Sequence, residues 1–336
     1  MNEKRYLDEV SFLRPILIIL LVLYHAFIIY DGGWKEPAGF MDIPAYKWVA
    51  KCSFAIMLEM FVFISGYLWA YQRETLSKKQ SFLQTIVNKF NRLIIPCLVF
   101  SALYLILLNR DNQLKISVLG ALEGVGHLWF LPMLFWCFVF GYAIIHIKIK
   151  IVWKLIVLCA VAALSILPLP FRIGTSFQYL LFFMGGYYAW IYKEKIAQKL
   201  KSKRILLWII FVILFVCLSL IEEKLSTVLL VERTDMVSKA VYLESKVYMR
   251  LLFSSIGVLA LYLTAVQFTK KQPLNKAYVE LGKYCMGVYV FQQFILQYLY
   301  YHTALPQTVG FMSLPWISFG IALLSSLLLT YTVKSL

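Results

Sequence analysis

The sequence predicts an all-α fold, a polytopic integral membrane bundle of about ten helices. Hydrophobic residues make up 61% of the 336 positions, and the mean hydropathy is +0.75. A water-soluble domain does not have enough polar surface to cover that proportion of apolar side chains. The apolar residues also form runs long enough to cross a hydrocarbon core of about 30 Å. These observations exclude a soluble globular enzyme.

The predicted spans are apolar segments separated by polar or charged stretches. In order, they cover residues 12–30, 50–71, 93–109, 128–147, 151–169, 176–192, 205–221, 249–268, 285–301 and 314–333. The fifth and tenth have the least defined ends. Because the intervening loops are too short to form a separate domain, we expect a single domain over residues 1–336.

Basic residues are concentrated in alternate loops. The loop after the first span contains Lys35 and Lys47, whereas the loop after the second contains five basic residues between 73 and 92. Cytoplasmic loops carry the excess of lysine and arginine, so we expect both termini to be cytoplasmic and the protein to lie in the cell membrane. The net charge of +16 then reflects topology and contact with anionic lipids, not binding of nucleic acid.

The first span contains two basic side chains, Arg14 and His25. Ionisable groups within a membrane span are costly and usually functional. Eleven helical steps of about 100° bring both residues to the same helix face, about 16 Å apart along the axis. Arg14 offers planar donors to a phosphate or carboxylate, or else extends to the lipid headgroups. Pro15 favours a place in the first turn of the helix.

His25 has two interpretations. Its ordinary pKa lies near neutrality, so it suits proton transfer from a hydroxyl group. Alternatively, the imidazole donates a structural hydrogen bond to a backbone carbonyl.

Glu123 and His127 form a second candidate pair. A regular helix would place residues four apart side by side, and a carboxylate next to an imidazole is suited to general-base chemistry. The glycines at 124 and 126 favour the alternative of a loop whose polar groups cap a helix. Trp129 is then either part of the site or part of an interfacial aromatic belt.

The second span contains Ser65, Gly66 and Tyr67 within an aromatic helix. The small residues permit close helix packing. Neither a suitable glycine pattern nor a strand-to-helix turn supports Ser65 as a nucleophile. Glu59, earlier in the same span, must be paired inside the bundle or protonated.

Taken together, these segments resemble the membrane-bound acyltransferase family 3, which includes O-acetyltransferases of surface glycans. The resemblance rests on five elements in the family's order across residues 14–289. They are Arg14-x10-His25, Phe63-x-Ser65-Gly66-Tyr67, Arg92-Leu-Ile-Ile-Pro96, Gly126-His127-Leu-Trp129-Phe130-Leu, and Leu281-Gly282-Lys283-Tyr284 followed by Val288-Tyr289.

The resemblance implies an acyltransferase that takes an acyl group, most simply acetyl, from acetyl-CoA at the cytoplasmic side. The acceptor is a hydroxyl group of a cell-surface or lipid-linked saccharide. It implies that His25 is the catalytic base or acyl relay and Arg14 its partner, while Glu123 orients a base or contacts the acceptor. Lys89 and Arg92 correspond to paired basic positions suited to the phosphates of the donor. Ser65, Tyr67, His127 and Trp129 are the expected substrate-binding residues.

The chain departs from the family pattern at three positions. Ser11 replaces a common aspartate, Lys89 replaces a common arginine, and Gln292 stands where many members have a histidine. We expect no metal, since the cysteines and histidines show no ligand spacing. The competing hypothesis is a transporter or flippase of a charged glycan-related substrate. Such proteins often contain inverted repeats and paired broken helices, and we find neither pattern in the sequence.

Overall fold

The computed structural model describes residues 7–108 and 118–335, and every regular element within them is helical. This confirms the predicted all-α fold. Contacts divide the chain into two compact units, each assembled from separate segments. Unit 1 comprises Met1–Leu58, Leu103–Leu114 and Ala265–Leu336, and unit 2 comprises Glu59–Ala102 and Lys115–Thr264. A single domain over residues 1–336 remains a prediction.

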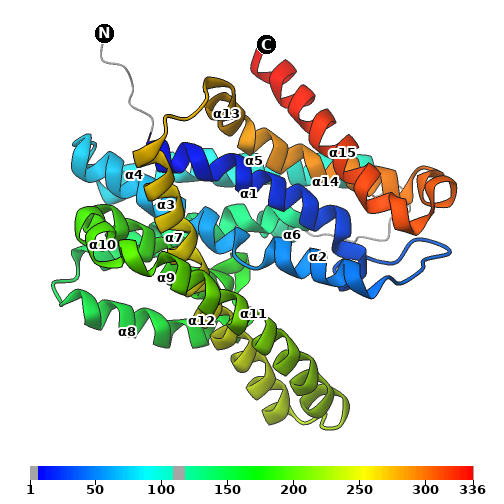
Figure 1. Cartoon of the computed structure of the whole chain (residues 1–336), viewed down its shortest axis with the longest axis horizontal. Coiled ribbons are helices and arrows are strands. Elements are labelled where there is room, and N and C mark those ends of the chain that lie inside the picture. The colour runs from blue at the N-terminus through cyan, green and yellow to red at the C-terminus, as the bar shows by residue number, and fades with distance from the viewer. Residues whose placement is uncertain (1–6, 109–117, 336) are drawn as a thin grey trace. The chain divides into compact units, whose positions relative to one another are not determined.

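Unit 1 is built around its first helix, which packs on four others (Figure 1). The main helices are α1 (Asp8–Phe27), α2 (Pro44–Phe54), α13 (Lys276–Leu281), α14 (Cys285–Tyr301) and α15 (Leu305–Ser335). Apolar side chains of α1 such as Leu17 and Val22 are fully buried. The hydroxyl of Tyr278 in α13 donates to the carbonyl of Phe12, at 2.6 Å. The start of α1 is therefore held by α13.

Helix α1 begins earlier than the sequence analysis predicts. It starts at Asp8, with Asp8 and Glu9 in its first turn, and Pro15 lies inside the helix. The expectation that Pro15 occupies the first turn is therefore wrong. Acidic residues favour the amino end of a helix, which explains the extension. Arg14 consequently lies about 9 Å along the axis from Asp8, well inside the helix.

Aromatic side chains link the end of α1 to α2 and α15. The Tyr30 hydroxyl donates to the Phe311 carbonyl at 2.6 Å, and the Tyr46 hydroxyl donates to the Met312 carbonyl at 2.8 Å. Trp316 donates in turn to the Tyr46 hydroxyl, at 3.1 Å. Aromatic side chains with a polar group suit this position, because they bury a large area and still complete hydrogen bonds.

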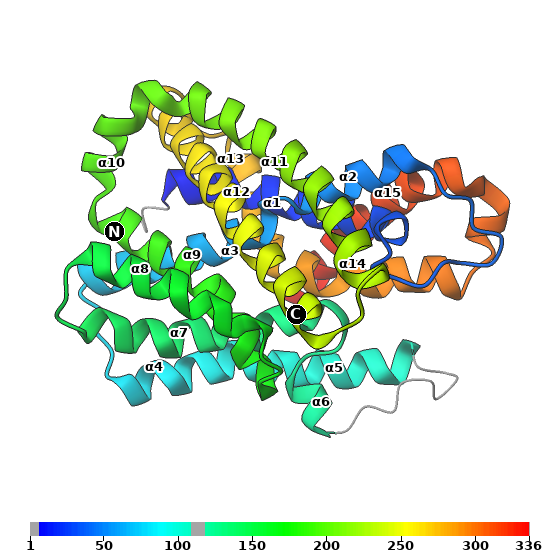
Figure 2. The ribbon, with the colours of Figure 1, turned by 90° about the horizontal axis from the view of Figure 1, so that it is seen from below.

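Unit 2 contains the remaining helices. They are α3 (Met57–Ala70, with unit 2 beginning at Glu59), α4 (Phe82–Lys89), α5 (Ile95–Leu108, with unit 2 ending at Ala102), α6 (Val118–Leu122), α7 (Phe130–His146), α8 (Ile151–Ala162), α9 (Ile173–Ile191), α10 (Lys193–Leu200), α11 (Arg204–Ser226) and α12 (Met236–Lys271, with unit 2 ending at Thr264). Helix α7 packs on α4 and α9, and α9 also packs on α8 (Figure 2).

Two glycines let α3 and α9 approach until their backbones touch. A Cβ atom at Gly66 would overlap the carbonyl oxygen of Phe183, and one at Gly186 would overlap the carbonyl oxygen of Phe63. The contact is reciprocal, with one glycine from each helix. It is the close helix packing that the sequence predicts at Ser65 and Gly66.

Helices α11 and α12 form an antiparallel pair. Trp208 donates to the Thr264 hydroxyl at 3.0 Å near one end. Further along, the rings of Phe215 and Phe253 lie 5.9 Å apart. The hairpin is closed near its turn by an ion pair of 2.7 Å between Lys246 and Glu222.

Seven helices in the described part of the chain are long and apolar enough to cross a membrane. They are Asp8–Asp31, Pro44–Thr75, Phe82–Leu108, Gly126–His146, Arg204–Val231, Met236–Lys271 and Leu305–Ser335. The other three predicted spans correspond to the shorter apolar helix Ile151–Ile166, to α9 and to α14. The count of ten and the cytoplasmic termini remain predictions. The terminal residues 1–6 and 336, and the end of the span 93–109, lie outside the described residues.

We predict that Gly186→Ala destabilises the protein by about 2 kcal/mol or more, because backbone atoms cannot move aside for a methyl group as a flexible side chain can. The measurement is thermal unfolding of the purified protein in detergent. The matched control is Gly185→Ala on the same helix, where the new Cβ would meet only the Phe63 ring at 3.9 Å. Equal melting temperatures for the two variants would contradict the close contact.

Candidate functional site

His25 is buried within unit 1, with 6% of its surface exposed. Its Nδ1 atom lies 2.9 Å from the carbonyl oxygen of Leu21, one turn earlier in α1. A carbonyl oxygen only accepts hydrogen bonds, so Nδ1 must carry the hydrogen in this contact. In the neutral ring, the basic lone pair is then on Nε2. The two interpretations of His25 are therefore compatible, because the structural hydrogen bond also fixes which nitrogen is basic.

Aromatic rings surround the His25 imidazole. Its ring centroid lies 6.0 Å from that of Trp34, which in turn lies 6.1 Å from that of Tyr300. The Tyr300 hydroxyl donates to the carbonyl of Ala26, the residue after His25. Trp34 comes from the loop after α1, and the sequence analysis did not identify it. A single tryptophan near a membrane surface is typical of an aromatic belt, so nothing in the sequence distinguishes Trp34 as a site residue.

Arg14 lies on the same helix as His25, eleven residues earlier. Since α1 is helical from Asp8 to Phe27, the two residues share a face and lie about 16 Å apart along the axis. The Arg14 backbone carbonyl accepts a contact of 3.5 Å from the Cys285 sulfur, and its Cβ lies beside Gly282. The side chain of Arg14 is partly exposed. The structure therefore places Arg14 and His25 at opposite ends of the contact between α1 and α14.

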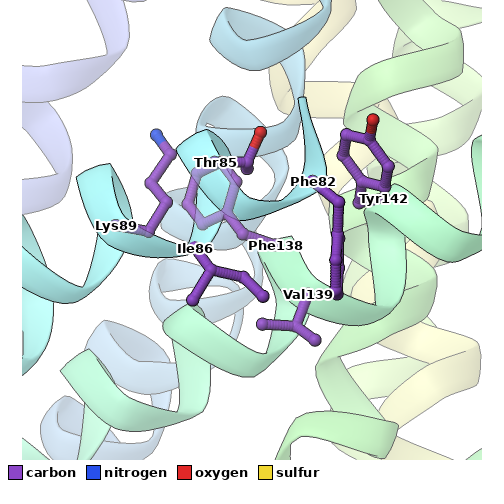
Figure 3. A pocket seen from close by; sticks show the side chains of 7 residues that line it. All are labelled: Phe82, Thr85, Ile86, Lys89, Phe138, Val139 and Tyr142. Carbon is purple, nitrogen blue, oxygen red and sulfur yellow. The ribbon is translucent and has the colours of Figure 1, made fainter. Parts of the chain in front are cut away.

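Lys89 and Arg92 lie in unit 2. The Lys89 ammonium group sits over the Phe138 ring, 3.8 Å from its centroid, a favourable cation–π contact. Lys89 and Phe138 also line a narrow crevice, where Figure 3 shows the Lys89 amine and the hydroxyls of Thr85 and Tyr142 toward the same side. Arg92 is exposed. In this conformation Lys89 packs on an aromatic ring, and Arg92 is accessible to a ligand.

The segment with Glu123 and His127 is a loop followed by a short 3-10 helix, Gly126–Trp129. Gly124 and Gly126 have positive φ angles of 83° and 56°, which a regular α-helix does not allow. The structure therefore has the predicted loop and not the regular helix that would place Glu123 beside His127. The Glu123 carboxylate accepts from the Phe171 backbone N–H at 3.1 Å, and the Glu123 carbonyl accepts from Arg172 at 3.2 Å. Glu123 thus joins this loop to the start of α9.

The remaining predicted substrate-binding residues lie in packed surroundings of unit 2. The Ser65 hydroxyl donates to the Phe61 carbonyl at 2.9 Å. Tyr67 is 1% exposed and packs against the rings of Trp190 and Tyr262. His127 is buried, and the Trp129 ring lies 6.2 Å from that of Tyr179. Ser65 and Tyr67 therefore contribute to helix packing in this structure.

Glu59 is completely buried in unit 2 and forms an ion pair with Arg250 of α12. Its second carboxylate oxygen, Oε2, has no hydrogen-bond partner among the described residues. The alternative of a paired Glu59 is therefore the one that the structure adopts. Sequence reasoning missed Arg250, because the two residues are 191 positions apart and no local pattern connects them.

An open groove of about 680 Å³ lies beside the end of α9 in unit 2. It is lined on one side by Glu74, whose carboxylate accepts a hydrogen bond of 2.7 Å from the Tyr187 hydroxyl. Trp190, Lys193 and Lys195 line it as well. The run of basic residues that begins at Lys193 therefore contributes to a groove in addition to its expected contact with lipid.

Among residues 7–108 and 118–335, no cluster of three or more histidine, cysteine, aspartate or glutamate side chains is arranged to hold a metal ion. Comparison with protein families matches residues 7–334 to the model of an acyltransferase domain. Comparisons with curated proteins and with solved structures found no match.

We predict that Arg250→Met destabilises the protein by about 3–5 kcal/mol, because it leaves the buried Glu59 carboxylate without its counter-charge. Thermal unfolding in detergent measures the effect. The control is Lys246→Met on the same helix, where the lost partner Glu222 is partly exposed and the expected cost is below about 1 kcal/mol. The double variant Glu59→Leu/Arg250→Met should recover most of the stability, and a double variant as unstable as Arg250→Met would contradict this account.

Proposed function

We propose that this chain, which belongs to the acyltransferase family matched over residues 7–334, transfers an acyl group from a cytoplasmic acyl-CoA to a hydroxyl group of a saccharide. The family makes the chain an acyltransferase, and its apolar helices make it a membrane protein. The finer parts of the proposal are an acetyl group, an acceptor on a cell-surface or lipid-linked saccharide, and a cell-membrane location with both termini inside.

The observation that carries the mechanism is the hydrogen bond from His25 to the Leu21 carbonyl. It fixes the ring orientation and leaves Nε2 as the basic nitrogen. In the proposed reaction, Nε2 takes the proton of the acceptor hydroxyl while the oxygen attacks the thioester carbonyl. The carbon–sulfur bond then breaks, and the protonated imidazole returns the proton to the departing thiolate. The products are the acyl ester and the free thiol.

Arg14 suits the phosphates of the donor, because its guanidinium group is always charged and binds phosphate through two parallel hydrogen bonds. Its position in the amino-terminal half of α1, on the side where the basic loops predict the cytoplasm, agrees with a donor that enters from the cytoplasm. Lys89 and Arg92 are further candidate phosphate ligands. For Lys89 this role requires the ammonium group to leave the Phe138 ring.

The proposed acceptor contacts lie in the loop that contains Glu123 and in α3. Glu123 has one carboxylate oxygen bonded to the Phe171 backbone, and we assign it a role in holding the loop that contains His127 and Trp129. His127, Trp129, Ser65 and Tyr67 are the proposed contacts of the acceptor.

We predict that His25→Ala lowers kcat at least about 100-fold, the range that loss of a general base produces. The assay measures release of free thiol from acetyl-CoA by the purified protein with a saccharide acceptor. The control is His146→Ala, because His146 makes the same type of bond to the carbonyl four residues earlier, at 2.7 Å, but is exposed. Normal turnover by His25→Ala would exclude His25 as the base. A wild-type protein that releases no thiol from any acyl-CoA would contradict the proposed donor.

A further inference from the structure

Gln292 of α14 is a completely buried carboxamide that the protein leaves unsatisfied. Its exposed fraction is 0%. Neither Nε2 nor Oε1 has a hydrogen-bond partner among the described residues. Burying such a group without a partner opposes folding. The next residue, Gln293, is 2% exposed and forms a side-chain hydrogen bond with Tyr104. Of these two neighbouring glutamines, only Gln292 therefore lacks a partner.

Gln292 belongs to the face of α14 that packs on α1. Cys285, Tyr289, Gln292, Leu296 and Tyr300 follow one another at intervals of three or four residues, which places them in one stripe along the helix. The ends of the stripe contact α1, since the Cys285 sulfur meets the Arg14 carbonyl and the Tyr300 hydroxyl meets the Ala26 carbonyl. Gln292 lies between these contacts, about 10 Å along the axis from Cys285 and about 12 Å from Tyr300.

Three groups therefore follow one another along the contact between α1 and α14. Arg14 lies at one end, the Gln292 carboxamide in the middle, and His25 at the other end. A primary carboxamide donates through its N–H groups and accepts through its oxygen. Another amide complements both at once, through one N–H donor and one carbonyl acceptor.

The proposed donor has groups in the same order. The arm of CoA that carries the thiol contains two secondary amides and ends at a phosphate. Counting bonds at the length per bond of an extended chain, the second amide lies about 10 Å from the thioester carbon, and the phosphate about 17 Å. The length to the phosphate is close to the spacing of about 16 Å between His25 and Arg14, and the length to the second amide is within about 2 Å of the spacing of about 12 Å between Gln292 and Tyr300 along α14.

From this juxtaposition we infer that Gln292 binds an amide of the pantetheine arm of the acyl donor, with the thioester at His25 and the phosphate at Arg14. The inference rests on the proposed acyl-CoA donor. Gln292 then acts in donor binding, and the carboxamide gains its missing partners only when the donor is bound.

The test compares Gln292→Met with the wild-type protein on two donors, acetyl-pantetheine, which has both amides, and the acetyl thioester of 2-mercaptoethanol, which has none. We expect kcat/KM to fall about 10-fold with acetyl-pantetheine, mainly through a higher KM, because the amide loses its hydrogen bonds. With the mercaptoethanol thioester we expect no change. The melting temperature should equal or exceed that of the wild type, since the substitution removes an unsatisfied buried group.

The matched control is Gln293→Met. It should lower the melting temperature, because Gln293 has a partner to lose, and any effect on kcat/KM should be the same for both donors. The inference is overturned if Gln292→Met lowers kcat/KM equally for both donors, or for neither. It is also overturned if Gln292→Met unfolds, because an unpartnered carboxamide contributes no stabilising bond. A wild-type protein inactive with every thioester would instead contradict the proposed function.

Discussion

Helix α14 is attached to α1 near both of its ends, through Cys285 to the Arg14 carbonyl and through Tyr300 to the Ala26 carbonyl. Both contacts use backbone acceptors on α1, so they fix the position of the helix without involving the side chains of Arg14 and His25. Because two attachment points define the register of the helices, every residue on the facing stripe of α14 acquires a defined depth along α1. The candidate site of unit 1 depends on this register.

Buried and half-buried polar groups have several kinds of hydrogen-bond partner in this protein. His25 is held by a carbonyl of its own helix, Glu59 by an arginine distant in sequence, and Glu123 by a backbone N–H of another segment. Each arrangement reduces the cost of removing a polar group from water.

The helical class followed from composition, and the shared face of Arg14 and His25 followed from helix geometry, because both depend only on local spacing. The close packing at Gly66 was also predictable, since small residues in an aromatic helix serve few other purposes. Contacts over long sequence distances were not predictable. Arg250 as the partner of Glu59 and Trp34 beside His25 required the tertiary structure. The predicted place of Pro15 in the first turn was wrong, because the acidic residues Asp8 and Glu9 extend α1 at its amino end, ahead of the apolar residues.

The reciprocal contact of Gly66 and Gly186 also has a consequence for motion within unit 2. Where side chains separate two helices, rotamer changes let one helix slide or rotate past the other. Here the backbones themselves touch at two points, so relative sliding would drive a carbonyl of one helix into the other. Helices α3 and α9 must therefore move as one rigid body during a catalytic cycle, and any opening within this unit has to take place at its other helices.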